Sequence, residues 1–162
     1  PTSGQLVYNT DLSQFQYYNG AAWVSLAYGL GVPQTVKVTV SSAELLALAT
    51  TPKDLIAAQG AGLAIDINRY SIKLTYGTTA YDFGALLGIN FESDLTTNYI
   101  LASISASTMN SANTVSGSAS PSSIGSQDRL KANEKLQLTT ASNPTTGDGV
   151  LTIWLTYTTI VL

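Results

Sequence analysis

The chain has 162 residues, enough for one ordinary domain or for one small domain with a short appendage. Only 10% of the residues are charged, against roughly a quarter in typical soluble domains, and the net charge is −3. The seven basic residues are scattered along the sequence, so we do not expect a nucleic-acid binder.

Two residue types that support much protein chemistry are missing. Without cysteine, neither disulfides nor thiolate-bound metals hold the fold together. Without histidine, the chain lacks the commonest general base and the usual metal ligand, so Ser-His-Asp catalysis is excluded and no cofactor is expected. No apolar run is long enough to cross a bilayer and no signal peptide opens the chain, so no membrane partner is expected. The abrupt start at Pro1 favours a fragment or a processed piece.

Residues 1–31 predict a small β-hairpin module. Short strands are expected at residues 6–8, 15–18 and 22–24, separated by turn residues at 9–11 and by Asn19-Gly20. Five aromatic residues lie in these strands, and an isolated β-meander of this size is marginal in water. Their rings must therefore be buried against the next domain or against identical chains.

Residues 32–162 predict a larger β-domain. Valines alternate with polar residues at 36–40, and a capping box at 41–44 predicts one short helical turn that ends before Pro52. Further strands are expected at 55–58, 65–67, 72–76, 85–91, 99–106, 136–138 and 150–161. Many short strands with little helix predict an all-β fold: an antiparallel, jelly-roll-like β-sandwich preceded by the β-hairpin module.

One long stretch has no strand pattern. Residues 107–127 are rich in Ser, Ala, Asn and Gly, and are expected to form a long loop. Small polar residues give adaptable hydrogen bonding at exposed tips, so this loop is the candidate for receptor contact. A mobile linker without a partner is an equally weighted alternative. The candidate contact residues are Met109, Asn110, Asn113, Ser118 and Ser122.

Several segments, taken in order, carry a family resemblance. Residues 4–11 (GQLVYNTD) and 16–24 (QYYNGAAWV) resemble a hairpin module common in phage tail-fibre and related trimeric shaft proteins. Residues 42–48 (SAELLAL), Thr51-Pro52 and 76–81 (YGTTAY) are similar to a β-domain of phage head-fibre, decoration and tail-appendage proteins. Residues 133–138 (NEKLQL), Asn143-Pro144 and 147–149 (GDG) resemble the closing hairpin of that domain, whereas residues 107–127 match no part of it.

The resemblance implies a homotrimeric structural component at the virion surface, with capsid or tail proteins as neighbours and no enzymatic activity. The alternative is a receptor-binding adhesin module of a tail fibre, with a host-cell glycan or surface protein as its partner. For the homotrimeric component, three weak sites on one rigid stalk would act together through avidity.

Aromatic residues are the candidate trimer contacts. Tyr8, Tyr17, Tyr18 and Trp23 could stack on a sugar ring, but packing where three chains meet is favoured. Trp154 is predicted on the face of the last strand that points away from the core, opposite to Leu151, Ile153, Leu155 and Tyr157. A subunit interface is favoured for Trp154, with an exposed ligand surface as the alternative.

Two acidic motifs are candidates for catalysis or for metal binding. Glu92 and Asp94 would share one face of a strand, whereas a glycosidase flanks its bond with two separated carboxyl groups in a cleft, so no catalytic pair is expected. Gly147-Asp148-Gly149 could seat an oxygen-ligated cation with Asn143, but a tight hairpin turn is favoured and no metal site is expected.

Overall fold

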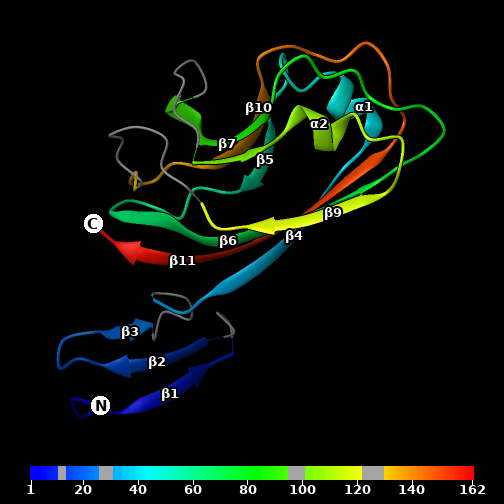
Figure 1. The fold of residues 1–162 in the computed structure, drawn as a ribbon. Helices are drawn as coiled ribbons and strands as arrows, with labels where there is room; N and C mark the ends of the chain where they lie inside the picture. The colour runs from blue at the N-terminus through cyan, green and yellow to red at the C-terminus, as the bar shows by residue number, and fades with distance from the viewer. Residues whose placement is uncertain (11–13, 26–30, 95–100, 122–129) are drawn as a thin grey trace.

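A computed structural model describes residues 1–10, 14–25, 31–94, 101–121 and 130–162 (Figure 1). The chain begins with a meander of three antiparallel strands: β1 (Leu6–Asn9), β2 (Gln14–Tyr18) and β3 (Trp23–Ser25). These strands match the three predicted for residues 1–31. In Figure 1 the meander lies outside the two stacked sheets that form the rest of the fold.

The first sheet of the sandwich is centred on the last strand of the chain. It contains β4 (Gln34–Val40), β11 (Val150–Val161), β6 (Leu63–Thr75) and β9 (Val115–Ala119), in that spatial order. All pairings are antiparallel: β11 pairs along its whole length with β6 and over residues 151–157 with β4.

The second sheet packs over the first. Its order is β5 (Lys53–Ile56), β10 (Leu136–Thr140), β7 (Leu87–Phe91) and β8 (Ala102–Ile104), again antiparallel. Two short helices, α1 (Ser42–Leu46) and α2 (Ala106–Met109), lie at one end of the sandwich (Figure 1). The predicted all-β, antiparallel sandwich is confirmed, whereas its jelly-roll character stays a prediction.

Every second side chain along the strands points inward, and these side chains fill the space between the two sheets. In β11, Leu151, Ile153 and Leu155 are fully buried and the residues between them are partly exposed, as predicted. Burying one such side chain stabilises the fold by roughly 1.5–3 kcal/mol. The largest fully buried side chains come from both layers: Phe91, Leu87, Ile89, Leu136, Leu138, Ile65, Leu74, Leu151, Ile153, Leu45, Leu48 and Met109.

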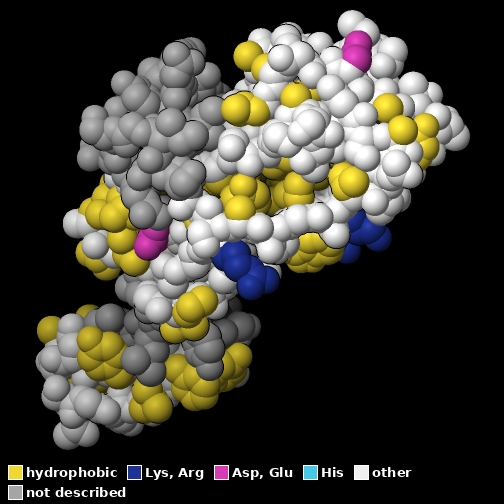
Figure 2. Space-filling model, in the orientation of Figure 1, with side chains coloured by type: hydrophobic (Ala, Val, Ile, Leu, Met, Phe, Trp, Pro, Cys, Tyr) yellow, Lys and Arg dark blue, Asp and Glu magenta, His cyan; other side chains and the backbone are white. Residues whose placement is uncertain are grey.

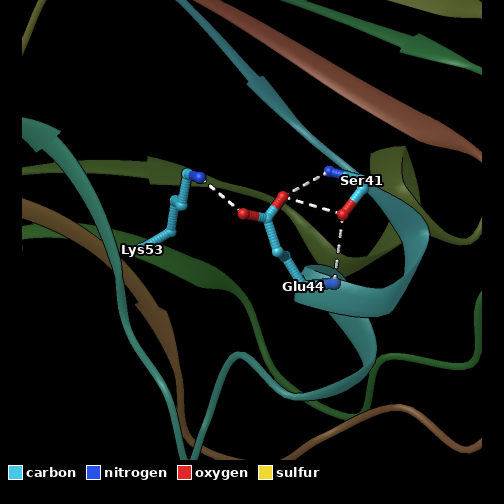
Figure 3. A network of polar contacts seen from close by, with 3 residues as sticks. All are labelled: Ser41, Glu44 and Lys53. Carbon is cyan, nitrogen blue, oxygen red and sulfur yellow. Dashed lines mark hydrogen bonds and ion pairs between the residues drawn. The ribbon is translucent and has the colours of Figure 1, made fainter.

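The predicted capping box is confirmed at the start of α1 (Figure 3). The Ser41 hydroxyl accepts a bond from the Glu44 backbone N–H at 3.4 Å, and the Glu44 carboxylate accepts one from the Ser41 backbone N–H at 2.8 Å. Lys53, on β5, donates to the same carboxylate at 2.5 Å. This contact with Lys53 and the bonds from Ser41 lower the pKa of Glu44 to about 2.

The two strands predicted at residues 65–67 and 72–76 correspond to the single strand β6, which ends at Thr75. The buried residues Ile65 and Ile67 fall at odd positions and Ile72 and Leu74 at even ones, so the alternation slips by one residue between them. A β-bulge lies at that place, because the pairing with β11 skips Asn68. The extra residue returns both halves of the strand to the same core face.

The prediction of a long loop at residues 107–127 is wrong for the first part of that stretch. It contains the end of α2 and the whole of β9, which pairs with β6. The strand lacks the β-branched and aromatic residues that usually mark strands, since only Val115 is of that kind in the sequence VSGSA. Residues 122–127 lie outside the described residues, and the strand predicted at 99–106 is described as β8 followed by α2.

Candidate functional site

One face of the meander presents large apolar side chains to solvent. Register places Leu6 opposite Tyr17 and Tyr8 opposite Phe15, and directly opposed residues share a face. Their exposed fractions are 56%, 36%, 53% and 38% respectively. The rings of Tyr8 and Phe15 pack edge to face, 5.0 Å between centroids. We call these four residues the aromatic face.

The predicted trimer contacts divide between the two faces of the meander. Tyr8 and Tyr17 belong to the aromatic face, whereas Tyr18 pairs with Trp23 on the opposite face, 5.5 Å between ring centroids. Trp23 is 37% exposed and Tyr18 is half-buried. The candidate list omitted Leu6 and Phe15, although the two-residue period of β1 and β2 could have identified both.

Trp154 lies in the middle of the outer face of the first sheet, as predicted. The register places it between Lys37 on β4 and Ser71 on β6. Its ring is half-buried, and the ammonium nitrogen of Lys37 lies 5.9 Å from the ring centroid. That distance is within the range of a cation–π contact.

A cleft of about 540 Å³ opens between the two sheets at their β8 and β9 edges. Figure 2 shows this hollow with hydrophobic side chains on its floor. The floor includes Tyr70 and Ile72, and the Tyr70 hydroxyl donates to the Ser103 carbonyl at 2.7 Å. None of the described residues that line the cleft is charged, and residues with hydroxyl groups dominate its side near β8 and α2: Ser103, Ser105, Ser107, Thr108 and Ser111.

Gly117 leaves the β9 side of the cleft open, because it carries no side chain. Gly117 pairs with Ile72 on the face of β9 that points inward. A Cβ atom built on Gly117 would meet no heavy atom within 4 Å. A larger residue there would extend into the cleft and narrow it.

The five predicted receptor-contact residues have different environments. Met109 is fully buried in the core, so the prediction is wrong for it: α2 turns its side chain inward. Asn110 is half-buried, and its amide donates to the Phe83 carbonyl and accepts from the Phe83 N–H. Asn113 and Ser118 are exposed, and Ser118 lines the cleft. Ser122 lies outside the described residues.

Glu92 and Asp94 lie in the short 3-10 helix η1 (Glu92–Asp94), not on a strand as predicted. Asp94 is buried and pairs with Lys131 at 2.5 Å. Glu92 pairs with Lys135 at 3.2 Å, and that contact helps to raise the pKa of the Lys135 ammonium group. Each carboxylate therefore contacts a lysine, although Lys135 is shared between Glu92 and Asp54.

Asp148 connects two loops and does not form the predicted hairpin turn. It precedes β11 on the connection from β10, and these strands belong to different sheets. Its carboxylate accepts bonds from the Thr78 hydroxyl at 2.7 Å and from the backbone N–H groups of Thr78 and Thr79 at 2.9 Å. These bonds lower the pKa of Asp148. The hydrogen-bond donors of Thr78 and Thr79 thus occupy the Asp148 carboxylate oxygens that a bound cation would use as ligands.

The two motif segments 76–81 and 143–149, far apart in the sequence, interlock at this point. The Tyr81 hydroxyl donates to the Gly149 carbonyl at 2.7 Å, and burial raises the pKa of Tyr81 to about 12. Gly147 has a φ of +125°, and a Cβ atom there would lie 2.1 Å from the Tyr81 ring. Only glycine fits both constraints. The roles of Tyr81, Gly147 and Gly149 in these motifs are thus structural, because they hold the two loops together.

Within the described ranges, no three His, Cys, Asp or Glu side chains gather closely enough to hold a metal ion. In the same part of the chain, no helix has the length and apolar character needed to span a membrane. Comparison of the chain with protein-family models, with curated proteins and with solved structures found no match.

Proposed function

We propose that this chain is a non-enzymatic structural module of a phage-like particle, a homotrimeric fibre, head-fibre or decoration domain at the virion surface. Capsid or tail proteins of the particle are its neighbours. The observation that carries the proposal is the aromatic face of the meander, which is exposed in a single chain. Apolar patches of this kind, on elements too small to fold alone, mark contact surfaces.

The energetics favour covering the aromatic face. Removing the exposed half of four large apolar side chains from water contributes roughly 3–6 kcal/mol per chain before the cost of association. Three copies that meet about one axis would bury three such faces together. The choice of a trimer over a dimer rests on the resemblance to trimeric shaft proteins.

A non-enzymatic role is supported by the side-chain chemistry. The sequence contains no histidine, and Glu92 and Asp94 are each paired with a lysine. The conspicuous turn motifs around Asp148 are used to hold loops together. What remains on the surface is weakly charged and rich in hydroxyl groups, which suits a protein with many neighbours.

The experiment is a mass measurement by light scattering at micromolar concentration. We expect a mass close to three times that of one chain. The double variant Tyr8→Ser/Tyr17→Ser should shift the mass towards that of a monomer, because it removes two of the three rings of the aromatic face.

The matched control is Leu86→Ser/Val161→Ser, which also replaces two exposed apolar side chains, but outside the meander. It should leave the mass unchanged. A monomer mass for the unaltered chain would overturn the proposal, and so would an equal effect of the control pair.

A second candidate function is receptor binding, and the observation that favours it is the cleft between β8 and β9, whose described lining residues carry no charge. Its size lies within the range of small-ligand sites, roughly 300–1,000 Å³. Hydroxyl rims with an apolar floor suit a neutral sugar. A glycan array and a cell-adsorption assay with Gly117→Leu, which fills the cleft, test it: binding that the variant abolishes supports it, and negatives in both count against it.

A further inference from the structure

The outer face of the first sheet combines positive charge with one aromatic ring. Alternation along the strands points these residues away from the core, since their neighbours in sequence face inward. The register aligns them across four strands. We call them the basic face: Thr35, Lys37 and Thr39 on β4, Thr152, Trp154 and Thr156 on β11, Arg69, Ser71 and Lys73 on β6, and Ser116 and Ser118 on β9.

The cations of the basic face have no acidic partner among the residues that the structure describes. Lys37, Arg69 and Lys73 are exposed and take part in no ion pair there. By contrast, the lysines elsewhere in the described sandwich, Lys53, Lys131 and Lys135, each contact a carboxylate. Dark blue side chains in Figure 2 lie on the underside of the sandwich, below β9.

This segregation of charge is unusual for a chain with a net charge of −3. Asp66 is the nearest acidic residue in register: it pairs with Thr158, two positions along β11 from the partner of Arg69, and so lies at the end of the same face. The basic face carries three cations against this one carboxylate, so it is positive on a protein whose net charge is −3. Two copies that met through this face would bring cation against cation, which costs free energy. That argues against a face-to-face contact between copies and leaves Trp154 on a ligand surface.

The spacing of the charges restricts the ligand. Arg69 and Lys73 are four residues apart on one strand, roughly 13 Å at 3.3 Å per residue. Lys37 lies two strands away from both and is offset from each by two residues along the strand, which gives roughly 12 Å. Trp154 lies between them, with the Lys37 ammonium group 5.9 Å from its ring centroid. The three cations are therefore widely spaced, and the gaps between them are large enough to hold a sugar ring.

We infer that the basic face binds an acidic polysaccharide. Such a chain carries one carboxylate or sulfate per sugar or per few sugars, which suits widely spaced cations. Its pyranose rings present C–H faces that stack on an indole, and its hydroxyls bond to serine and threonine. Duplex DNA fits poorly, because it carries about one charge per 1.7 Å, far denser than this face. The inference goes beyond the assembly role and does not depend on the trimer.

The experiment measures binding of the full chain to immobilised polygalacturonate, with neutral dextran and duplex DNA as comparisons. We expect binding to polygalacturonate at low salt that weakens as salt rises, and none to dextran. Lys37→Gln/Lys73→Gln and, separately, Trp154→Ala should each weaken binding roughly tenfold, through lost charge and lost stacking.

Lys53→Gln/Lys135→Gln makes the same change of charge at paired lysines and should leave binding within twofold. Gly117→Leu, which fills the cleft on the other side of the sheet, should also leave it unchanged. The inference is overturned by absence of binding at low salt, by equal losses in both lysine pairs, by indifference to Trp154→Ala, or by tighter binding to DNA. Light scattering on each variant shows separately whether the trimer is intact.

Discussion

The meander and the sandwich use the same kind of strand and reach opposite outcomes. Both alternate apolar with polar residues, but the sandwich has a second sheet to cover its apolar face. Phe91 in the sandwich is fully buried, whereas Phe15 in the meander is 38% exposed. The alternation of apolar residues therefore predicts which face of a sheet must be buried. Whether one chain can bury that face depends on the presence of a second layer.

The largest test of this contrast replaces one phenylalanine in each region. Phe91→Ala should lower the free energy of unfolding of the sandwich by about 3–5 kcal/mol, because it removes a fully buried ring. Phe15→Ala should change it by about 0.5 kcal/mol or less and should instead weaken association. Urea unfolding monitored by circular dichroism checks both. Comparable losses of sandwich stability would remove the distinction between the regions.

The interlocked loops provide the next effect in size. Tyr81→Phe deletes the buried hydroxyl that bonds the Gly149 carbonyl and should cost about 1–2 kcal/mol, since that carbonyl loses its partner. Tyr76→Phe removes a similar bond, to the Thr78 carbonyl, at an exposed position and should cost about 0.5 kcal/mol or less. Thermal unfolding of the two variants compares them directly. Equal costs would show that burial of the bond is unimportant.

The capping box predicts a smaller, pH-dependent effect. The pKa of Glu44 is lowered from 4.5 to about 2 in the folded chain. The carboxylate therefore stabilises the fold above pH 4.5, and this contribution disappears as the pH falls from about 4.5 to about 2. Solvent screening limits it to about 1 kcal/mol or less.

Glu44→Gln isolates that charge, because glutamine can still complete a capping box. Urea unfolding should show the unaltered chain more stable than the variant at pH 6, and the difference should shrink at pH 3. A difference that is the same at both pH values would contradict the assignment.

The smallest effect is expected at the cleft. Gly117→Leu should change the free energy of unfolding by about 0.5 kcal/mol or less, because the new side chain enters open space on a strand with ordinary backbone angles. Thr39→Leu, on the exposed outer face of β4, is the matched control. A loss above about 1 kcal/mol for Gly117→Leu alone would mean that β9 lies closer to β8 than described.

Local patterns predicted the elements whose sequence and environment agree. The alternation of β11 and the capping box at Ser41 and Glu44 were both recognisable, because each depends on residues close together in the chain. The bulge at Asn68 was visible as a slip in the alternation of β6 but was interpreted as a boundary between strands. Strand β9 was missed because its Ser, Gly and Ala residues carry little strand propensity.

The candidate sites were predicted less well, for a different reason. Lys37, Arg69 and Lys73 are far apart or unremarkable in the sequence, and only the register of three strands brings them around Trp154. Met109 was assigned to a receptor loop because its surroundings are polar, whereas α2 turns it into the core. Surfaces assembled from several strands depend on pairing, which composition does not reveal.

The claim that copies of the chain cover the aromatic face can be tested by hydroxyl-radical footprinting of Tyr8, Phe15 and Tyr17. We predict that these rings are protected at tens of micromolar protein and become reactive on dilution, while the fully buried Phe91 stays protected throughout. Rings that react at every concentration to the extent expected from their exposure in one chain would contradict the account.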